Sequence, residues 1–192
     1  MRDSLKITVP YQFWRVILAH IEAAGIAFVF QTVAFWAFFD WNGFRQALGV
    51  IFTLVYAGFI YHIVRKLAVL DHKDYTPLKP SVFKGVMFGV SVALITGIMY
   101  AVWRLTWIYS SNNTGLIGWP AIIFNFIFTY WTFPFFGLMG TELGHVSVLG
   151  QILMFGVPIA ASTAGYLAAK YKIDLVDIFH RSVYEKPEDD GI

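Results

Sequence analysis

Residues 82–109 read VFKGVMFGVSVALITGIMYAVWRLTWIY, and no charged side chain interrupts positions 85–103. An α-helix needs about 20 mostly apolar residues to cross the hydrocarbon core of a bilayer. This stretch meets that requirement with residues to spare. It therefore predicts a transmembrane helix, around which the rest of the chain can be interpreted.

The composition of the whole chain agrees with a membrane location. Hydrophobic residues make up 58% of the 192 residues and charged residues 14%, whereas soluble domains average about 25% charged. The net charge of +2 is too small to favour nucleic acid as a partner. There is no cysteine, which excludes disulfides, thiol catalysis and cysteine metal sites.

Four further apolar stretches qualify as spans or come close, at about 14–39, 46–64, 119–139 and 148–169. The first two are separated by the turn signal Asp40-Trp41-Asn42-Gly43, so we expect an antiparallel hairpin. The second stretch is expected to stop at Arg65-Lys66, and Asp71 and His72 to lie in a solvated loop that follows it. A second loop is expected at 110–115.

The stretch 119–139 differs from the others. It is dense in aromatic side chains, and Pro134 and Gly137 interrupt it. Proline removes a backbone donor and glycine weakens a continuous helix. We therefore interpret this stretch as a re-entrant or interfacial segment on the outer face, with a fifth true span as the alternative.

The distribution of Lys and Arg distinguishes the two topologies, because these residues prefer cytoplasmic loops. With four spans and both termini inside, twelve basic residues lie inside and two outside. With five spans, eight lie inside and six outside. We predict an all-α, polytopic transmembrane helical bundle of four spans plus the aromatic segment.

This topology divides the chain into three parts. Residues 1–13 form a cytoplasmic N-terminal segment, 14–169 the helical bundle, and 170–192 a cytoplasmic tail. In the tail, Asp174 and Asp177 resemble a capping box. A short amphipathic helix on the membrane surface is expected there.

Small residues recur at every fourth position in each proposed span. In membranes such residues let helix backbones approach closely, and a packed bundle is expected, with a dimer face as the alternative. The rows are Ala19, Ala23 and Ala27; Gly49, Thr53 and Ala57; Gly85, Gly89, Ala93, Gly97 and Ala101; and Gly156, Ala160, Ala164 and Ala168.

Ionisable residues inside a span are costly and are therefore functional candidates. His20 and Glu22 in the first span and His62 in the second are expected at a similar depth in the inner leaflet. His20 and Glu22 are two positions apart, and side chains at this spacing on a helix point in different directions. Only one of the two can therefore face His62. Either a proton-responsive pair or an ordinary interhelical hydrogen bond fits, and the hydrogen bond is favoured.

Three more candidates are expected near the outer face. Arg104 should extend its side chain to the lipid headgroups. Glu142 and His145 are three residues apart and would share one face of a helix. Two ligands are fewer than zinc requires, so no metal and no cofactor are predicted.

Two junctions of the chain resemble small multi-pass membrane proteins of low-GC bacteria, which are mostly uncharacterised. The residues concerned are Tyr75-Thr76-Pro77-Leu78-Lys79-Pro80 with Lys84-Gly85, and Gly165-Tyr166 with Lys170-Tyr171-Lys172 and Tyr184-Glu185-Lys186. The resemblance implies a bacterial cytoplasmic membrane and cytoplasmic termini. It implies no activity and no catalytic residue.

No Walker A, HExxH, GxSxG or GxGxxG motif occurs. A non-enzymatic accessory, scaffold or regulatory component of a membrane assembly is the favoured function, with the lipid bilayer and a membrane-protein partner or a second copy as partners. The alternative is a small oligomeric transporter or channel that uses His20, Glu22 and His62. A membrane enzyme with Glu142 and His145 at its site is the weakest hypothesis.

Overall fold

The computed structural model describes residues 8–37, 42–72, 80–114, 118–139 and 145–173. These residues form five α-helices and one 3₁₀ helix, and none of them is in a strand. The elements are α1 (Val9–Ala37), α2 (Asn42–Asp71), α3 (Val82–Thr114), α4 (Trp119–Thr132), η2 (Phe133–Leu138) and α5 (Val148–Lys170).

The helices are suited to a lipid environment. Five segments are long and apolar enough to cross a membrane: Val9–Ala34, Gly43–Asp71, Phe83–Ser110, Trp119–Leu138 and Val148–Lys170. Large apolar side chains also point outward from every helix, and Val33, Leu54 and Leu105 are each about two-thirds exposed. A soluble protein rarely exposes apolar surface so extensively. The chain is an all-α integral membrane protein.

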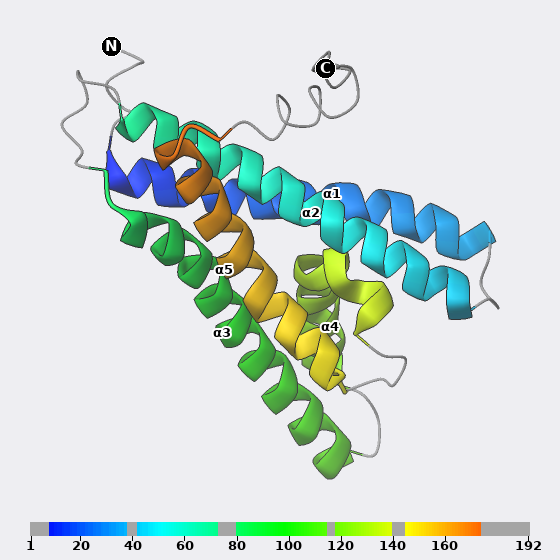
Figure 1. Ribbon diagram of the computed structural model, residues 1–192. Coiled ribbons are helices and arrows are strands. Elements are labelled where there is room, and N and C mark those ends of the chain that lie inside the picture. Colours follow the sequence, from blue (N-terminus) through cyan, green and yellow to red (C-terminus); the bar gives the residue numbers. More distant parts are fainter. Residues whose placement is uncertain (1–7, 38–41, 73–79, 115–117, 140–144, 174–192) are drawn as a thin grey trace, which may run out of the picture.

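The helices form two arms that meet at one end and diverge toward the other (Figure 1). One arm is the antiparallel hairpin of α1 and α2, and the other is α3 packed antiparallel against α5. The start of α1, the end of α2, the start of α3 and the end of α5 gather where the arms meet. We call this the Asp71 end, after a residue described below, and the opposite end the far end.

Close backbone contact holds α5 against α3. A Cβ atom placed on Gly89 would overlap the Cα atom of Ile159, and one placed on Gly85 would lie 2.6 Å from the Cβ atom of Tyr166. Glycine is therefore required at both positions for the two helices to approach this closely. α5 runs through Pro158 as one helix, and Ser147 caps its start, because the Ser147 hydroxyl accepts a hydrogen bond from the Gly150 amide.

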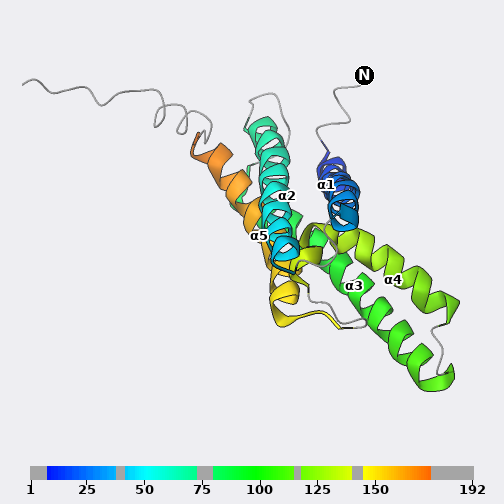
Figure 2. The same ribbon diagram turned by 90° about the vertical axis from the view of Figure 1, so that its right-hand side faces the viewer.

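The segment α4–η2 enters the space between the arms from the far end. Ser110 near the end of α3 bonds to the Gly118 amide, and the Trp103 indole donates to Asn125 Oδ1 at 3.0 Å. α4 thus runs back along the far half of α3, as Figure 2 shows. It ends near the middle of the bundle.

From there η2 returns to the far end along α2. Its residues contact Thr53 first and then Gly49, which lies nearer the start of α2. Leu138 then accepts a hydrogen bond from Ser147, just before α5 begins. Both ends of α4–η2 therefore lie at the far end, and α1, α2, α3 and α5 are the four described helices that pass between the two ends.

Two helices continue beyond their predicted ends. α2 passes through Arg65 and Lys66 to Asp71, and α3 continues through Ser110 to Thr114, so the predictions of a stop at Arg65-Lys66 and of a loop from Ser110 were wrong at these residues. Lys and Arg are good helix formers, and a helix can extend past the hydrocarbon core without losing backbone bonds. The predicted tail helix beginning at Asp174 lies outside the described residues.

α5 ends in a hydrogen-bonded cap. The Ile173 amide donates to the Ala168 carbonyl at 2.8 Å and the Lys172 amide to the Ala169 carbonyl at 3.2 Å. Lys172 has φ of 54°, the left-handed conformation that this cap requires and that glycine usually supplies. The cap satisfies carbonyl groups at the Asp71 end of α5.

Candidate functional site

A buried polar cluster lies where α4 reaches the middle of the bundle. His20 on α1 is 1% exposed. Its Nδ1 lies 2.8 Å from the Tyr56 hydroxyl of α2, and its Nε2 lies 3.0 Å from the main-chain oxygen of Trp131 on α4. The imidazole therefore joins three elements at one point.

The partners of His20 determine its tautomer. A carbonyl oxygen can only accept, so Nε2 carries the proton and donates to Trp131. In a neutral imidazole Nδ1 then accepts, and the Tyr56 hydroxyl donates to it. Both ring nitrogens of His20 are thus occupied by groups of this chain, and neither is left to bind a metal or to take a proton from a substrate.

The same segment is held at two more carbonyl groups. Pro134 and the 3₁₀ geometry of η2 break the ordinary helical bonding pattern. The Gln31 amide donates to the Phe133 oxygen at 3.0 Å, and the Thr53 hydroxyl lies 3.2 Å from the Pro134 oxygen. Side chains from α1 and α2 therefore satisfy carbonyl groups that lipid could not.

Contacts of aromatic side chains also hold α4 and η2 against α2 and α3. The Trp131 indole donates to the Thr96 hydroxyl of α3 at 2.8 Å. Phe128 stacks on Trp103 with ring centroids 4.8 Å apart, and Phe135 of η2 packs edge-on against Tyr56 at 5.1 Å. The polar and aromatic contacts together fix a broken helix in the middle of the bundle.

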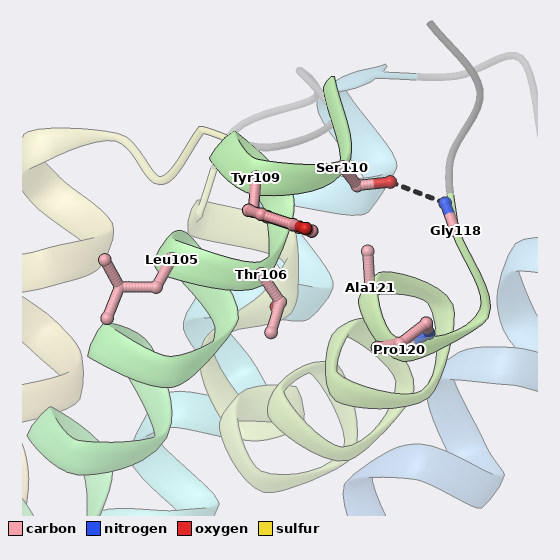
Figure 3. Close-up of a pocket in the computed structure, with 7 residues that line it drawn as sticks. All are labelled: Leu105, Thr106, Tyr109, Ser110, Gly118, Pro120 and Ala121. Carbon is pink, nitrogen blue, oxygen red and sulfur yellow. Dashed lines mark hydrogen bonds between the residues drawn. The ribbon is translucent and has the colours of Figure 1, made fainter. Parts of the chain in front are cut away.

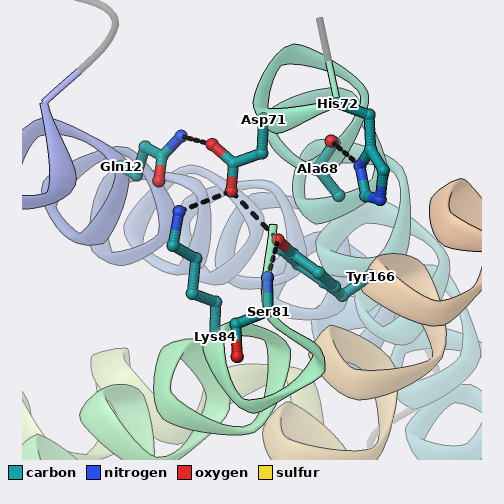
Figure 4. A network of polar contacts seen from close by, with 7 residues as sticks. All are labelled: Gln12, Ala68, Asp71, His72, Ser81, Lys84 and Tyr166. Atoms are coloured by element: carbon teal, nitrogen blue, oxygen red, sulfur yellow. Dashed lines mark hydrogen bonds and ion pairs between the residues drawn. The ribbon is translucent and has the colours of Figure 1, made fainter. Parts of the chain in front are cut away.

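A second polar cluster defines the Asp71 end (Figure 4). Asp71 accepts hydrogen bonds from Gln12 at 2.7 Å, from Lys84 at 2.8 Å and from the Tyr166 hydroxyl at 3.1 Å. The Ser81 amide donates to the same hydroxyl. One carboxylate, itself 3% exposed, therefore joins α1, α2, α3 and α5.

Asp71 was predicted to lie in a solvated loop, and this was wrong. It is the last residue of α2 and is buried against three other helices. Its neighbour His72 is exposed and bonds to the Ala68 carbonyl. The charged residues next to Asp71 in the sequence indicated a solvent-exposed loop. Its hydrogen-bond partners come from distant parts of the chain, so the local sequence could not reveal them.

An apolar groove of about 450 Å³ opens between the far ends of α3 and α4 (Figure 3). Leu105 and Tyr109 line one side, and Pro120 and Ala121 line the other. The hydrogen bond between Ser110 and Gly118 closes its end. The groove has no charged side chain among its lining residues and suits an aliphatic chain better than a polar ligand.

The predicted trio of His20, Glu22 and His62 does not form one cluster. His20 points into the bundle, whereas His62 is exposed on α2. Glu22 points outward from α1 and accepts a hydrogen bond from Arg15 at 3.0 Å. The interhelical partner of His20 on α2 is Tyr56.

Two of the three residues predicted near the outer face are described by the structure, and both lie toward the far end. Arg104 is half-buried near the end of α3, and His145 is exposed before α5. Glu142 lies outside the described residues. Among the residues that the structure describes, no three His, Asp or Glu side chains gather in a geometry suited to a metal ion.

The predicted small-residue rows divide into two kinds. Gly85 and Gly89 lie in the contact between α3 and α5, and a Cβ atom placed on Gly97 would lie 3.7 Å from the Phe155 ring. Gly156, Ala160 and Ala164 instead lie on the exposed face of α5, and a Cβ on Gly156 would meet nothing within 4 Å. Within this chain α5 packs through the neighbouring row of Pro158, Ala161, Ser162 and Gly165.

Sequence reasoning missed Tyr56, Trp131 and Tyr166 as members of the polar clusters. Each occurs in an apolar stretch rich in aromatic residues, where a hydroxyl or an indole N–H gives no distinct pattern. A buried Tyr or Trp does need a hydrogen-bond partner, which was the one available signal.

No family model, curated protein or solved structure matches the chain.

Proposed function

We propose that this integral membrane protein is a non-enzymatic component of a membrane assembly, with an accessory, scaffold or regulatory role. The observation that carries the proposal is the outward row of Gly156, Ala160 and Ala164 on α5. Rows of this spacing bring transmembrane helices into close contact. No helix among the described residues covers this row, and a helix of another protein would fit there.

The use of the polar side chains supports the same function. His20, Gln31 and Thr53 bond to the backbone of α4–η2, and Asp71 joins four helices. These residues hold the bundle together. Because these side chains are engaged inside the bundle, its outer surface is the part that can recognise another molecule.

The proposed orientation places the Asp71 end in the cytoplasm of a bacterium, with both termini on that side. Arg65, Lys66, Lys84, Lys170 and Lys172 lie toward that end, whereas Arg45 and Arg104 lie toward the other. This asymmetry follows the preference of basic residues for the cytoplasmic side. In this orientation α4–η2 is a re-entrant segment that enters from the outer face.

The test is affinity purification of the tagged protein from its native membrane in mild detergent. The variant Gly156→Leu/Ala160→Leu fills the row, and Ala101→Leu is a control that adds a leucine at an exposed position of α3. We expect a stoichiometric partner with the wild type and with Ala101→Leu, and its loss with the filled row. Recovery of the same partner from all three proteins, or of none from the wild type, contradicts the proposal.

One observation favours a small transporter or channel as the second candidate. α4 gives way to a 3₁₀ segment inside the bundle, and broken helices of this kind often form the binding sites of transporters. Ion flux in vesicles containing the purified wild type and its His20→Ala, Glu22→Gln and His62→Ala variants tests this function. Flux by the wild type that His62→Ala abolishes while the variant stays folded would support it over the first proposal, because His62 is exposed and takes no part in holding the bundle together.

A further inference from the structure

An ion pair lies on the outward face of α1, inside the candidate span. Arg15 Nη1 donates to Glu22 Oε1 at 3.0 Å, and the two side chains are 36% and 45% exposed. The span runs from Val9 to Ala34, so Glu22 is near its middle. Charged side chains at such a depth normally face the interior of a bundle or another protein, because lipid does not solvate them.

The pair leaves most of its hydrogen-bonding capacity unused. A guanidinium offers five N–H donors and a carboxylate two oxygens. Among the described residues, the two side chains share a single bond, through one oxygen of Glu22. The other oxygen of Glu22 and the remaining N–H groups of Arg15 have no hydrogen-bond partner among the described residues, and both side chains are partly exposed, so a group from another molecule can reach them.

The surface of α1 around the ion pair carries a row of apolar side chains that a second helix could pack against. Leu18, Ile26, Val29 and Val33 recur at helical spacing on the same side of α1 as Glu22. Ile26, Val29 and Val33 are 46%, 58% and 67% exposed. Branched side chains lose little rotational freedom when they pack, so this face can be covered at low entropic cost.

We infer that this face of α1 binds the same face of a second copy of the chain. The inference rests on the proposed function, since it names one partner of a protein that works by association. A two-fold axis along the membrane normal brings the two faces together with the same orientation in the membrane. Arg15 of each copy then donates to the unused carboxylate oxygen of Glu22 in the other copy.

Charge complementarity selects a second copy as the occupant. The face carries one positive and one negative group two helical turns apart, about 10 Å along the axis. Arg15 already spans this separation within its own helix, so it can span it to a neighbouring helix. Two copies form a closed, neutral network of four charges, whereas an apolar helix would bury the pair without satisfying it.

Cysteine crosslinking in vesicles tests the inference, because the chain contains no cysteine of its own. Ile26→Cys places a thiol on the proposed face, and Leu94→Cys places one on the exposed face of α3 as a matched control. With an oxidant we expect disulfide-linked dimers from Ile26→Cys and about tenfold fewer from Leu94→Cys. Equal yields from the two proteins would overturn the inference.

Charge reversal then identifies the contact. Arg15→Glu makes both groups of one copy negative, and Glu22→Arg makes both groups positive. Each variant, combined with Ile26→Cys, should form about tenfold fewer dimers than Ile26→Cys alone. The two variants mixed should recover them as mixed dimers. Arg15→Gln and Glu22→Gln, which remove the charge without reversing it, serve if the reversed charges lower insertion.

The outcomes separate this inference from the proposed function. Failure of the mixed variants to recover crosslinking overturns the second copy as occupant. If the α1 variants instead release a different protein in affinity purification, a heterologous partner occupies the face and the proposed function stands. The α5 variants address the proposed function alone, because they leave Arg15 and Glu22 unchanged.

Discussion

His20 donates from Nε2 to the main-chain oxygen of Trp131, 3.0 Å away, at the point where α4 gives way to the 3₁₀ turn. This bond connects the only buried histidine among the described residues to the backbone of the broken helix. The other described histidines, His62, His72 and His145, are exposed. Among the described histidines, His20 alone is therefore part of the packing inside the bundle.

His20→Ala should lower the free energy of unfolding by about 1–3 kcal/mol, because it leaves the Trp131 carbonyl and the Tyr56 hydroxyl buried without their partner. The measurement is unfolding by a denaturing detergent, followed by tryptophan fluorescence. His62→Ala is the matched control and should change stability by less than about 0.5 kcal/mol. Equal losses for the two variants would show that His20 does not anchor α4.

Gly89→Ala should destabilise the bundle by about 1–3 kcal/mol, because its new methyl group overlaps the backbone of α5. Gly156→Ala should instead be neutral or stabilise the isolated chain by up to about 1 kcal/mol, since alanine favours a helix and the added atom meets nothing. Thermal unfolding in detergent measures both. A neutral Gly89→Ala would mean that α3 and α5 are not in backbone contact.

Asp71→Ala should cost about 3 kcal/mol, because it leaves Lys84, Gln12 and Tyr166 without the acceptor that they share. The double variant Asp71→Ala/Lys84→Ala should cost less than the sum of the two single variants, since removing one partner already breaks the pair. Unfolding of the four proteins of this cycle gives the coupling energy. Strict additivity would indicate that Asp71 and Lys84 do not interact.

Single cysteines introduced into this cysteine-free chain should report the path of α4–η2. Trp119→Cys and His145→Cys, at exposed positions on either side of the segment, should react with a membrane-impermeant thiol reagent from the same side of the membrane. Lys172→Cys should react from the opposite side. Labelling of positions 119 and 145 from opposite sides would mean that the segment crosses the membrane completely.

The sequence was sufficient to predict the helices, because bilayer thickness sets a length that apolar stretches must reach. The expectation that Pro134 interrupts the fourth stretch is also met, since η2 begins at Phe133. Helix ends were harder to predict. Arg65 and Lys66 mark a change in polarity, but α2 continues past them because nothing in these residues breaks a helix.

The sites could be predicted only in part, because they depend on which helix faces which. His20 was a candidate from its place in an apolar span, yet its partners Tyr56 and Trp131 are 36 and 111 residues away in sequence. α5 shows the same limit. Its two neighbouring rows, one with Gly156 and the other with Gly165, both contain small residues, so spacing alone could not indicate that Gly165 packs within the chain.

The cluster around Asp71 has a mechanical consequence. It ties four helices together at one end, while the arms diverge toward the other (Figure 1). A helix of the length of α3 extends about 50 Å, so a rotation of about 5° at the tied end displaces the opposite end by about 4 Å. Small rotations at the Asp71 end would therefore change the width of the space between the arms that α4–η2 fills.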